Sequence, residues 1–376
     1  MKTSRFNRFA AAAIATMLAS PAVHAADGTW TDLTTGGLWS AGGNWSGSTI
    51  AGGSGFTANF NTLNITADNT VHLDSALTLG NLIFGDTTPS NNSWILDTGA
   101  VAVPGNILTL AGTTPTITVN NLGTGTATIT AVIAGSAGLI KDGAGTLQLG
   151  IGLGTMPINT FTGGMTIKAG IVSLTGASSA GSNVITLGDS SGSTAATLSS
   201  GGVGGGAVSY ANAIILGAST GVLTIGSTTG GAVTFTGGVT GTNNLILAQS
   251  SNNAAGSITF STGSLNNVGT ITNAGASTQT TPVTISSTIG SNVTGLIQNS
   301  NTKLVLTAAN TAFIGDTTVT SGTLNLQNTN SLQNSTLKMN GGSVTFGTST
   351  TVAITSVALG GLSGCLLYTS PSPRDS

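Results

Sequence analysis

The sequence predicts an all-β protein that folds as a right-handed parallel β-helix, that is, a β-solenoid, with an N-terminal β cap region. Three observations carry this prediction: a spaced pattern of short apolar runs is repeated, apolar and polar residues alternate, and charge is scarce. Charged residues make up 5% of the chain, hydrophobic residues make up 39%, and glycine contributes 57 of 376 residues. Intrinsic disorder is typical of low hydrophobicity and high net charge, so this composition favours a folded chain.

Apolar and polar residues alternate in many short runs, such as Thr116–Val119 and Ser257–Phe260. Strict alternation places every second side chain on a dry face and is typical of β-strands. No segment after the first 25 residues has an apolar period of 3.6, so we expect the mature chain to be nearly all β. Further runs of this kind are Ile107–Leu110, Val222–Ile225, Val233–Phe235 and Ser343–Phe346.

A pattern of four short strands occurs twice, in Gly138–Leu174 and again in Gly295–Leu326. Such repeats indicate a solenoid, because one unit cannot bury its own apolar face and must stack on copies of itself. A degenerate third copy is Phe235–Leu245. Leu245 lies 51 residues before Leu296, and Leu139 lies 106 residues before Leu245. We therefore predict a unit of roughly 50 residues that makes two turns of the coil.

The aliphatic residues of the two clear copies should point inward. At about 20–25 residues a turn, the chain would make some 14–16 turns and form a rod on the order of 70 Å long, since coils stack about 4.8 Å apart. The residues predicted to be internal are Leu147, Leu149, Ile167, Leu174, Leu304, Leu306, Val319 and Leu324.

The first copy has a lysine, loop glycines and spaced aliphatic residues in a fixed order: Lys141, Gly143, Gly145, Thr146, Leu147, Leu149, Gly164, Thr166, Ile167, Gly170 and Leu174. This order resembles the autotransporter-associated β-strand repeat, whose unit reads G-L-x-K-x-G-x-G-T-L-x-L, a loop, then F/Y-x-G-x-T-x-I-x-x-G-x-L-x-L. The first copy departs from it in a longer loop before Phe161. The second copy has Gln298 for the lysine, and Ser300 and Thr302 for the loop glycines. The resemblance covers most of residues 28–346, and it implies a surface-displayed passenger in which such repeats are associated with efficient export.

Four tryptophans lie near the start of the mature chain: Trp30, Trp39, Trp45 and Trp94. They could stack on sugars, or they could close the end of the solenoid, where a bare coil would leave an unpaired hydrophobic edge. We expect the second arrangement. We therefore divide the mature chain into an N-terminal β region with a Trp-rich cap, residues 26–130, and a repeat solenoid, residues 131–364.

Residues 1–25 are predicted to be a secretory signal peptide that is cleaved after Ala25. Three basic residues precede the apolar run Ala10–Ala19, and Val23 and Ala25 provide small residues at the cleavage site. The apolar run is shorter than the ~20 residues that cross a bilayer, and no other segment approaches that length. We expect a secreted, extracellular or outer-cell-surface protein.

The composition changes abruptly after Gly364. Residues 365–376 contain the single cysteine, Cys365, together with Pro371, Pro373 and Arg374. We expect this segment to be a non-native, adapter-derived tail on a truncated reading frame, with an anchoring or translocator domain lost downstream. The solenoid would then end on an unpaired edge, through which we expect self-association.

The charged residues argue against several functions. Residues 26–364 contain four lysines, no arginine and nine aspartates, a net charge of about −5. Nucleic-acid binding needs a basic surface, so no nucleic acid is expected as a partner. Glycoside hydrolysis needs two facing carboxylates, and the aspartates are scattered along the chain. His72 and Asp74 share one strand face, either as an orienting pair or, as we expect, as part of an exposed polar face.

Metal and cofactor sites are not expected either. His72 is the one histidine after the signal region, which leaves no set of zinc ligands. The segment Gly201–Gly206 has the glycines of a calcium-binding repeat but lacks its aspartate, so we interpret it as a loop. We predict a protein that is not an enzyme, with no catalytic, cofactor-binding or metal-binding residues.

The predicted function is a secreted or cell-surface structural or adhesive β-solenoid stalk whose repeats assist export and surface display. Its expected partners are surface glycans or other cell-surface molecules. Two alternatives remain at this stage. One is a carbohydrate-binding or glycan-cleaving β-helix, and the other is a self-assembling extracellular matrix fibre, given the low charge and strand-rich repeats.

Overall fold

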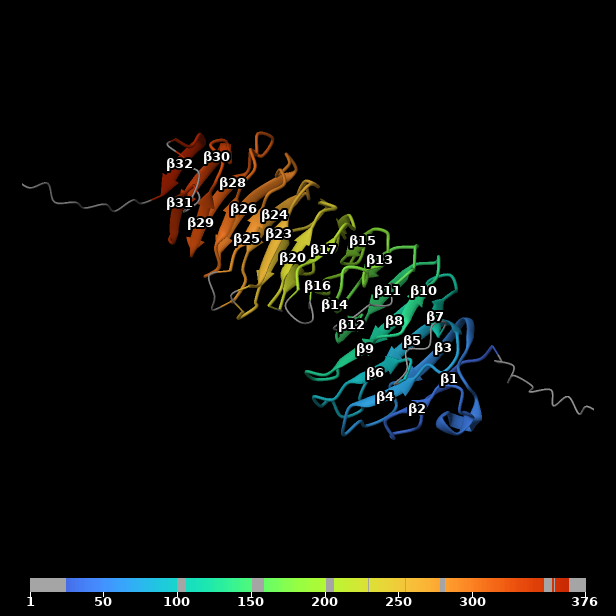
Figure 1. Cartoon of the computed structure of the whole chain (residues 1–376). Helices are drawn as coiled ribbons and strands as arrows, with labels where there is room; N and C mark the ends of the chain where they lie inside the picture. Colours follow the sequence, from blue (N-terminus) through green and yellow to red (C-terminus); the bar gives the residue numbers. More distant parts are fainter. Residues whose placement is uncertain are drawn as a thin grey trace, which may run out of the picture.

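The computed structural model describes residues 25–99, 106–150, 159–200, 206–228, 230–253, 255–277, 281–347, 354 and 356–364. They form an elongated rod along which the strands stack in order from the N-terminal to the C-terminal end (Figure 1). Strands pair in parallel throughout the three sheets. Helical structure in the described ranges is limited to the short 3₁₀ segments η1 (Gly42–Asn44) and η2 (Ser46–Ser48). The predicted all-β parallel solenoid is confirmed, and its right-handed sense stays a prediction.

The longest sheet, here called sheet 2, runs along the whole rod. Its strands in the described residues number 14, and paired residues in neighbouring strands are 20 to 34 positions apart in sequence. Each pairing therefore joins one coil to the next, and several coils are longer than predicted. The strands are β2 (Gly37–Leu38), β4 (Asn69–His72), β6 (Trp94–Asp97), β9 (Thr126–Ile129), β12 (Thr146–Leu149), β14 (Gly170–Leu174), β16 (Ala196–Ser200), β19 (Leu223–Ser227), β22 (Leu245–Gln249), β24 (Gly269–Asn273), β26 (Val293–Asn299), β28 (Asp316–Ser321), β30 (Leu332–Met339) and β32 (Leu359–Gly364).

Sheet 1 forms a second face of the N-terminal and central coils. Two of its strands, β7 (Ile107–Leu110) and β10 (Val132–Ala134), branch beside β5. The sheets continue past residue 130, and the proposed boundary between residues 130 and 131 stays a prediction. The main path of sheet 1 is β1 (Gly28–Thr29), β3 (Gly53–Phe60), β5 (Leu77–Phe84), β8 (Thr116–Val119), β11 (Leu139–Asp142), β13 (Met165–Ile167), β15 (Ile185–Leu187), β18 (Ile214–Leu216) and β21 (Val239–Gly241).

Sheet 3 forms a face of the central and C-terminal coils. The coils at the centre of the rod thus carry a strand on each of three faces, whereas those nearer the ends carry strands mainly on two. The strands of sheet 3 are β17 (Val208–Tyr210), β20 (Ala232–Phe235), β23 (Ser257–Phe260), β25 (Val283–Ile285), β27 (Leu304–Leu306), β29 (Thr323–Leu326) and β31 (Ser343–Phe346).

The core lies inside the coil and consists of columns of aliphatic side chains. All eight residues predicted to point inward are fully buried. Full burial of a leucine side chain stabilises the fold by about 1.5–3 kcal/mol, so these columns contribute much of the stability. Alternation alone selected them correctly, because a strand of a hollow coil has one dry face.

The four tryptophans lie in the interior of the first coils, with Trp94 in β6 between β4 and β9, and their role as a cap stays a prediction. All are buried, and the rings of Trp30, Trp39 and Trp45 surround Phe60 with centroid distances of 5.7, 5.7 and 5.9 Å. The indole N–H groups are satisfied internally; that of Trp39, for example, donates to the Ala51 carbonyl at 3.0 Å. The interpretation of these residues as a sugar-stacking platform is wrong, because their ring faces are covered.

The 51-residue spacing corresponds to two coils. Leu245 pairs with Ile271, which pairs with Leu296, all in sheet 2. The 106-residue spacing is different: Leu139 lies in β11 of sheet 1, so it does not share a face with Leu245. The first copy occupies sheets 1 and 2 in alternation, and the second copy occupies sheets 2 and 3. The reason is that each central coil contains a third strand. After those coils, the strands of the repeat therefore fall on sheets 2 and 3 instead of sheets 1 and 2.

The lysine of the repeat holds a corner of the coil. Lys141 is fully buried, and its Nζ donates to the carbonyls of Asp142, Gly143 and Ala169 at 2.9, 2.7 and 3.0 Å. Three acceptors replace the water that the ammonium lost on burial. Desolvation nevertheless lowers the pKa of Lys141 to about 8, partly opposed by the charge of Asp142.

Gln298 takes the place of this lysine in the second copy and is also fully buried. Its Nε2 donates to the carbonyls of Ser300 and Thr302, each at 2.8 Å. Its Oε1 accepts a hydrogen bond of 2.7 Å from Nδ2 of Asn273 in the preceding coil. The substitution thus keeps the function of the lysine, which is to satisfy carbonyl groups at the corner.

A buried asparagine links three successive coils in both copies. Asn159 accepts from the Ile133 N–H at 2.9 Å and donates to the Ser179 carbonyl at 3.0 Å. Asn310 makes the corresponding bonds to Ile289 and Ser331 at 2.9 and 3.1 Å. These amides satisfy backbone groups where the strands are interrupted, so they fasten each coil to both neighbours.

Replacing Lys141 with methionine should lower the free energy of unfolding by about 1–3 kcal/mol, because three carbonyls at the corner, that of Ala169 buried, lose their donor. Lys168→Met is the matched control. Lys168 is about one third exposed and lies 3.7 Å from Asp189, and its loss should change the stability by less than about 0.5 kcal/mol. Urea unfolding of both variants measures the difference. Equal stability of the two variants would contradict the role of Lys141.

The stability should rise between about pH 8 and 10 and fall above pH 10. The pKa of Lys141 is lowered from 10.5 to about 8, so in that interval the unfolded chain binds a proton that the folded chain has released. Burial raises the pKa of Tyr210 from 10.0 to about 12, so there the folded chain keeps a proton that the unfolded chain loses.

Urea unfolding at intervals from pH 7 to 11 tests this profile. Lys141→Met should lack the rise and Tyr210→Phe should lack the fall. A flat wild-type curve over this range would show that neither group titrates as inferred.

Candidate functional site

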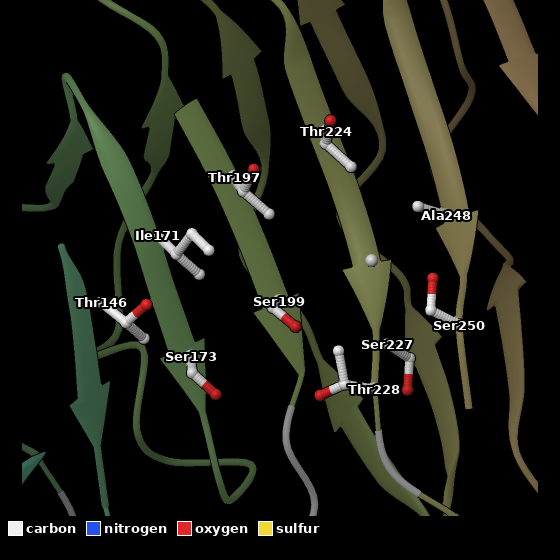
Figure 2. A pocket seen from close by; sticks show the side chains of 11 residues that line it. Thr146, Ile171, Ser173, Thr197, Ser199, Thr224, Ser227, Thr228, Ala248 and Ser250 are labelled. Atoms are coloured by element: carbon white, nitrogen blue, oxygen red, sulfur yellow. The ribbon is translucent and has the colours of Figure 1, made fainter. Parts of the chain in front are cut away.

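A shallow groove of about 310 Å³ lies on the outer surface of sheet 2, across β12, β14, β16, β19 and β22. Figure 2 shows its side chains spread over these neighbouring strands. The groove is lined by Thr146, Ile171, Ser173, Thr197, Ser199, Thr224, Gly226, Ser227, Thr228, Ala248 and Ser250.

Strand register produces the shape of the groove. One outward column contains Thr146, Ile171, Thr197 and Thr224, which pair in successive strands. The next outward column consists of small residues, Ser173, Ser199, Gly226 and Ala248, and is smallest at Gly226. These small side chains leave a depression beside the first column, and this depression is the groove. Mostly aliphatic buried residues occupy the inner face of the same strands.

The lining residues limit the chemistry of the groove. None of the eleven carries a charge, and their side chains offer mainly hydroxyl and methyl groups. Hydroxyl groups donate and accept hydrogen bonds, and methyl groups provide apolar contact. General acid–base catalysis needs a group that titrates near the working pH, and this lining has none. The groove is therefore suited to binding an uncharged molecule.

His72 and Asp74 do not form a pair. Nδ1 of His72 contacts Oδ1 of Asp97, its register neighbour one coil further along. Asp74 instead accepts from the backbone N–H of Ser40 at 3.1 Å and from its hydroxyl group. His72 thus lies on a partly exposed outer face, and its partner was missed because that partner is 25 residues away in sequence.

Most other carboxylates brace loops. Asp27, Asp68 and Asp86 accept from the backbone N–H groups of Thr57, Ser93 and Thr88 at 2.7, 2.7 and 3.0 Å. Such bonds fix turns between strands. The described part of the chain contains no group of three or more His, Cys, Asp or Glu side chains that could hold a metal ion. The absence of catalytic, cofactor and metal residues stays a prediction.

Several predicted segments lie outside the described residues. They are the signal region up to residue 24, Gly201–Gly205 of the glycine-rich loop, and the tail with Cys365. In the parts of the chain that are described, no helix has the length and apolar character needed to cross a membrane.

Comparison with known proteins gives one informative similarity. The adhesin BmaC autotransporter of Brucella suis biovar 1 (strain 1330) is 31% identical to this chain over 232 residues, which are 59% of the chain. The chain spans only about 6% of the length of that protein. No family model and no solved structure matches the chain. The chain is thus similar to a short part of an autotransporter adhesin.

Proposed function

We propose that this protein is an exported, cell-surface β-solenoid that acts as an adhesive or structural stalk and has no enzymatic activity. The observation that carries the proposal is the similarity to part of an autotransporter adhesin. The rod-like shape supports it, because a stack of coils holds surface features away from the cell at a fixed spacing. Export would begin with the signal peptide of residues 1–25.

The repeats are proposed to assist export and to belong with the autotransporter-associated β-strand repeat. Each coil contacts mainly its neighbours, so a solenoid can fold one coil at a time as the chain emerges. Near-absence of charge supports this, since like charges stacked about 4.8 Å apart would repel one another.

The groove on sheet 2 is the proposed contact surface for the adhesive function. Its hydroxyl and methyl groups favour an uncharged surface molecule such as a neutral glycan. This observation supports the carbohydrate-binding alternative within the adhesive function. It does not support glycan cleavage, because no carboxylate lines the groove.

Ala248→Arg should weaken adhesion about tenfold, because a long charged side chain would occupy the floor of the groove. Thr284→Arg is the matched control, since Thr284 also points outward from the middle of a strand, β25 in sheet 3. Binding of labelled protein to a cell layer and to a neutral-glycan array provides the measurement. Equal loss for both variants would reject the groove, and no binding by the wild type would reject adhesion.

Self-association is proposed to occur through the last described coil. Phe346 and Leu362 occupy interior columns, yet 56% and 58% of their surfaces are exposed, whereas Leu326 and Leu337 beneath them are buried. Because aromatic residues are proposed to close the opposite end, the partner surface would be the same coil of a second copy.

Sedimentation velocity should therefore detect a concentration-dependent dimer. The double variant Phe346→Thr and Leu362→Thr should remain monomeric to at least about tenfold higher concentration. Leu33→Thr, which removes a comparably exposed side chain near the other end, should leave the dimer unchanged. A monomeric wild type at all concentrations would exclude this contact.

A further inference from the structure

The interior changes from apolar to polar at the corner between sheets 2 and 3. One inner column of sheet 2 is apolar through Leu149 and Leu174 and then continues as Ser200, Ser227 and Gln249. All three polar residues are fully buried. A buried polar group destabilises a protein unless it has a hydrogen-bond partner, so each of the three requires one.

The first polar residue of this column has its partner. The hydroxyl oxygen of Tyr210 lies 3.2 Å from Oγ of Ser200, and the same hydroxyl group donates to the Leu174 carbonyl at 3.2 Å. Tyr210 projects from β17 of sheet 3 into the corner. One phenol group thus satisfies a serine side chain of its own coil and a carbonyl of the preceding coil.

The next coil repeats this arrangement without the phenol oxygen. Ser227 is the register neighbour of Ser200, and Phe235 is the register neighbour of Tyr210. The two rings stack with a centroid distance of 5.5 Å, so Phe235 takes in its coil the place that Tyr210 takes in the preceding coil. Phe235 carries only a hydrogen atom at the position where Tyr210 carries its hydroxyl group.

Two polar atoms at this position have no protein partner. They are Oγ of Ser227 and Nε2 of Gln249, which belong to paired residues in neighbouring strands. A third group follows from the repeat: the Ser200 carbonyl stands one coil beyond the Leu174 carbonyl, to which Tyr210 donates. The Ser200 carbonyl accepts from the Thr228 N–H at 3.3 Å and has a second lone pair for a further donor. One donor, one hydroxyl group and one carbonyl oxygen therefore surround the place of the missing oxygen.

We propose that these groups bind a buried water molecule in place of the missing phenol oxygen. The water accepts a hydrogen bond from Gln249 Nε2, donates to the Ser200 carbonyl and shares a hydrogen bond with Ser227 Oγ. Three hydrogen bonds are the usual number for a buried water. None of these groups is charged, which favours water over an ion.

A high-resolution crystal structure of the wild-type protein tests the site directly. An ordered water should lie within about 2.7–3.2 Å of both Ser227 Oγ and Gln249 Nε2. A direct hydrogen bond between these two side chains, with no water present, would overturn the proposal.

Phe235→Tyr gives a second and independent test. The new hydroxyl group should displace the water, satisfy Ser227 and raise the Tm by roughly 1–3 °C. Tyr210→Phe, the reverse change one coil earlier, should lower the Tm by a similar amount. In a Ser227→Ala background, the gain from Phe235→Tyr should shrink, because one partner of the hydroxyl group is gone.

The proposal fails if Phe235→Tyr folds but lowers the Tm, or if the water remains beside the new tyrosine. Should that variant not fold, water-to-amide NOE measurements on the wild type and on Ser227→Ala decide the question. The expected result is a long-lived water signal at the Ser227 amide that is lost in the variant, and a signal absent from both proteins would overturn the site.

Discussion

The structure depends on the register between one coil and the next. Parallel strands lie about 4.8 Å apart, so each side chain stands directly above its counterpart in the preceding coil. Each side chain therefore packs against the side chain at the equivalent position of the neighbouring coil. Aliphatic residues pack well in such columns, whereas stacked charges would repel one another. This constraint explains both the buried columns, such as Leu147 and Leu149, and the 5% charged residues.

The corners impose a second requirement. Where the chain turns from one face to the next, its backbone N–H and C=O groups no longer pair with a neighbouring strand and need other hydrogen-bond partners. Lys141, Gln298, Asn159 and Asn310 supply the missing partners from inside the coil. Lys141 donates to carbonyls of two coils, whereas Asn159 and Asn310 each bind one backbone N–H and one carbonyl of the neighbouring coils. Gln298 binds two carbonyls of its own coil and the side chain of Asn273 in the preceding coil. The solenoid is thus held by apolar columns along its faces and by buried amide or ammonium groups at its corners.

The same architecture shapes the outer surface on which the proposed adhesive function rests. Every strand that sends a leucine inward sends a neighbouring residue outward, and in sheet 2 those residues are mostly small and uncharged. A column that narrows to Gly226 makes a groove without any loop insertion. A rigid, neutral groove on a rod is suited to contact rather than to chemistry, since nothing in its lining transfers protons.

The sequence by itself determined the all-β class, the residues that face inward and the two-coil spacing from Leu245 to Leu296. Those features follow from alternation and local spacing, which every coil obeys. The tertiary structure alone decided which face each copy occupies, that Asp97 contacts His72, which carbonyls Lys141 and Gln298 satisfy, and that Phe235 is the register neighbour of Tyr210. Register neighbours lie 20 or more positions apart in coils of unequal length, and the length of each coil is set by its loops rather than by the strand pattern.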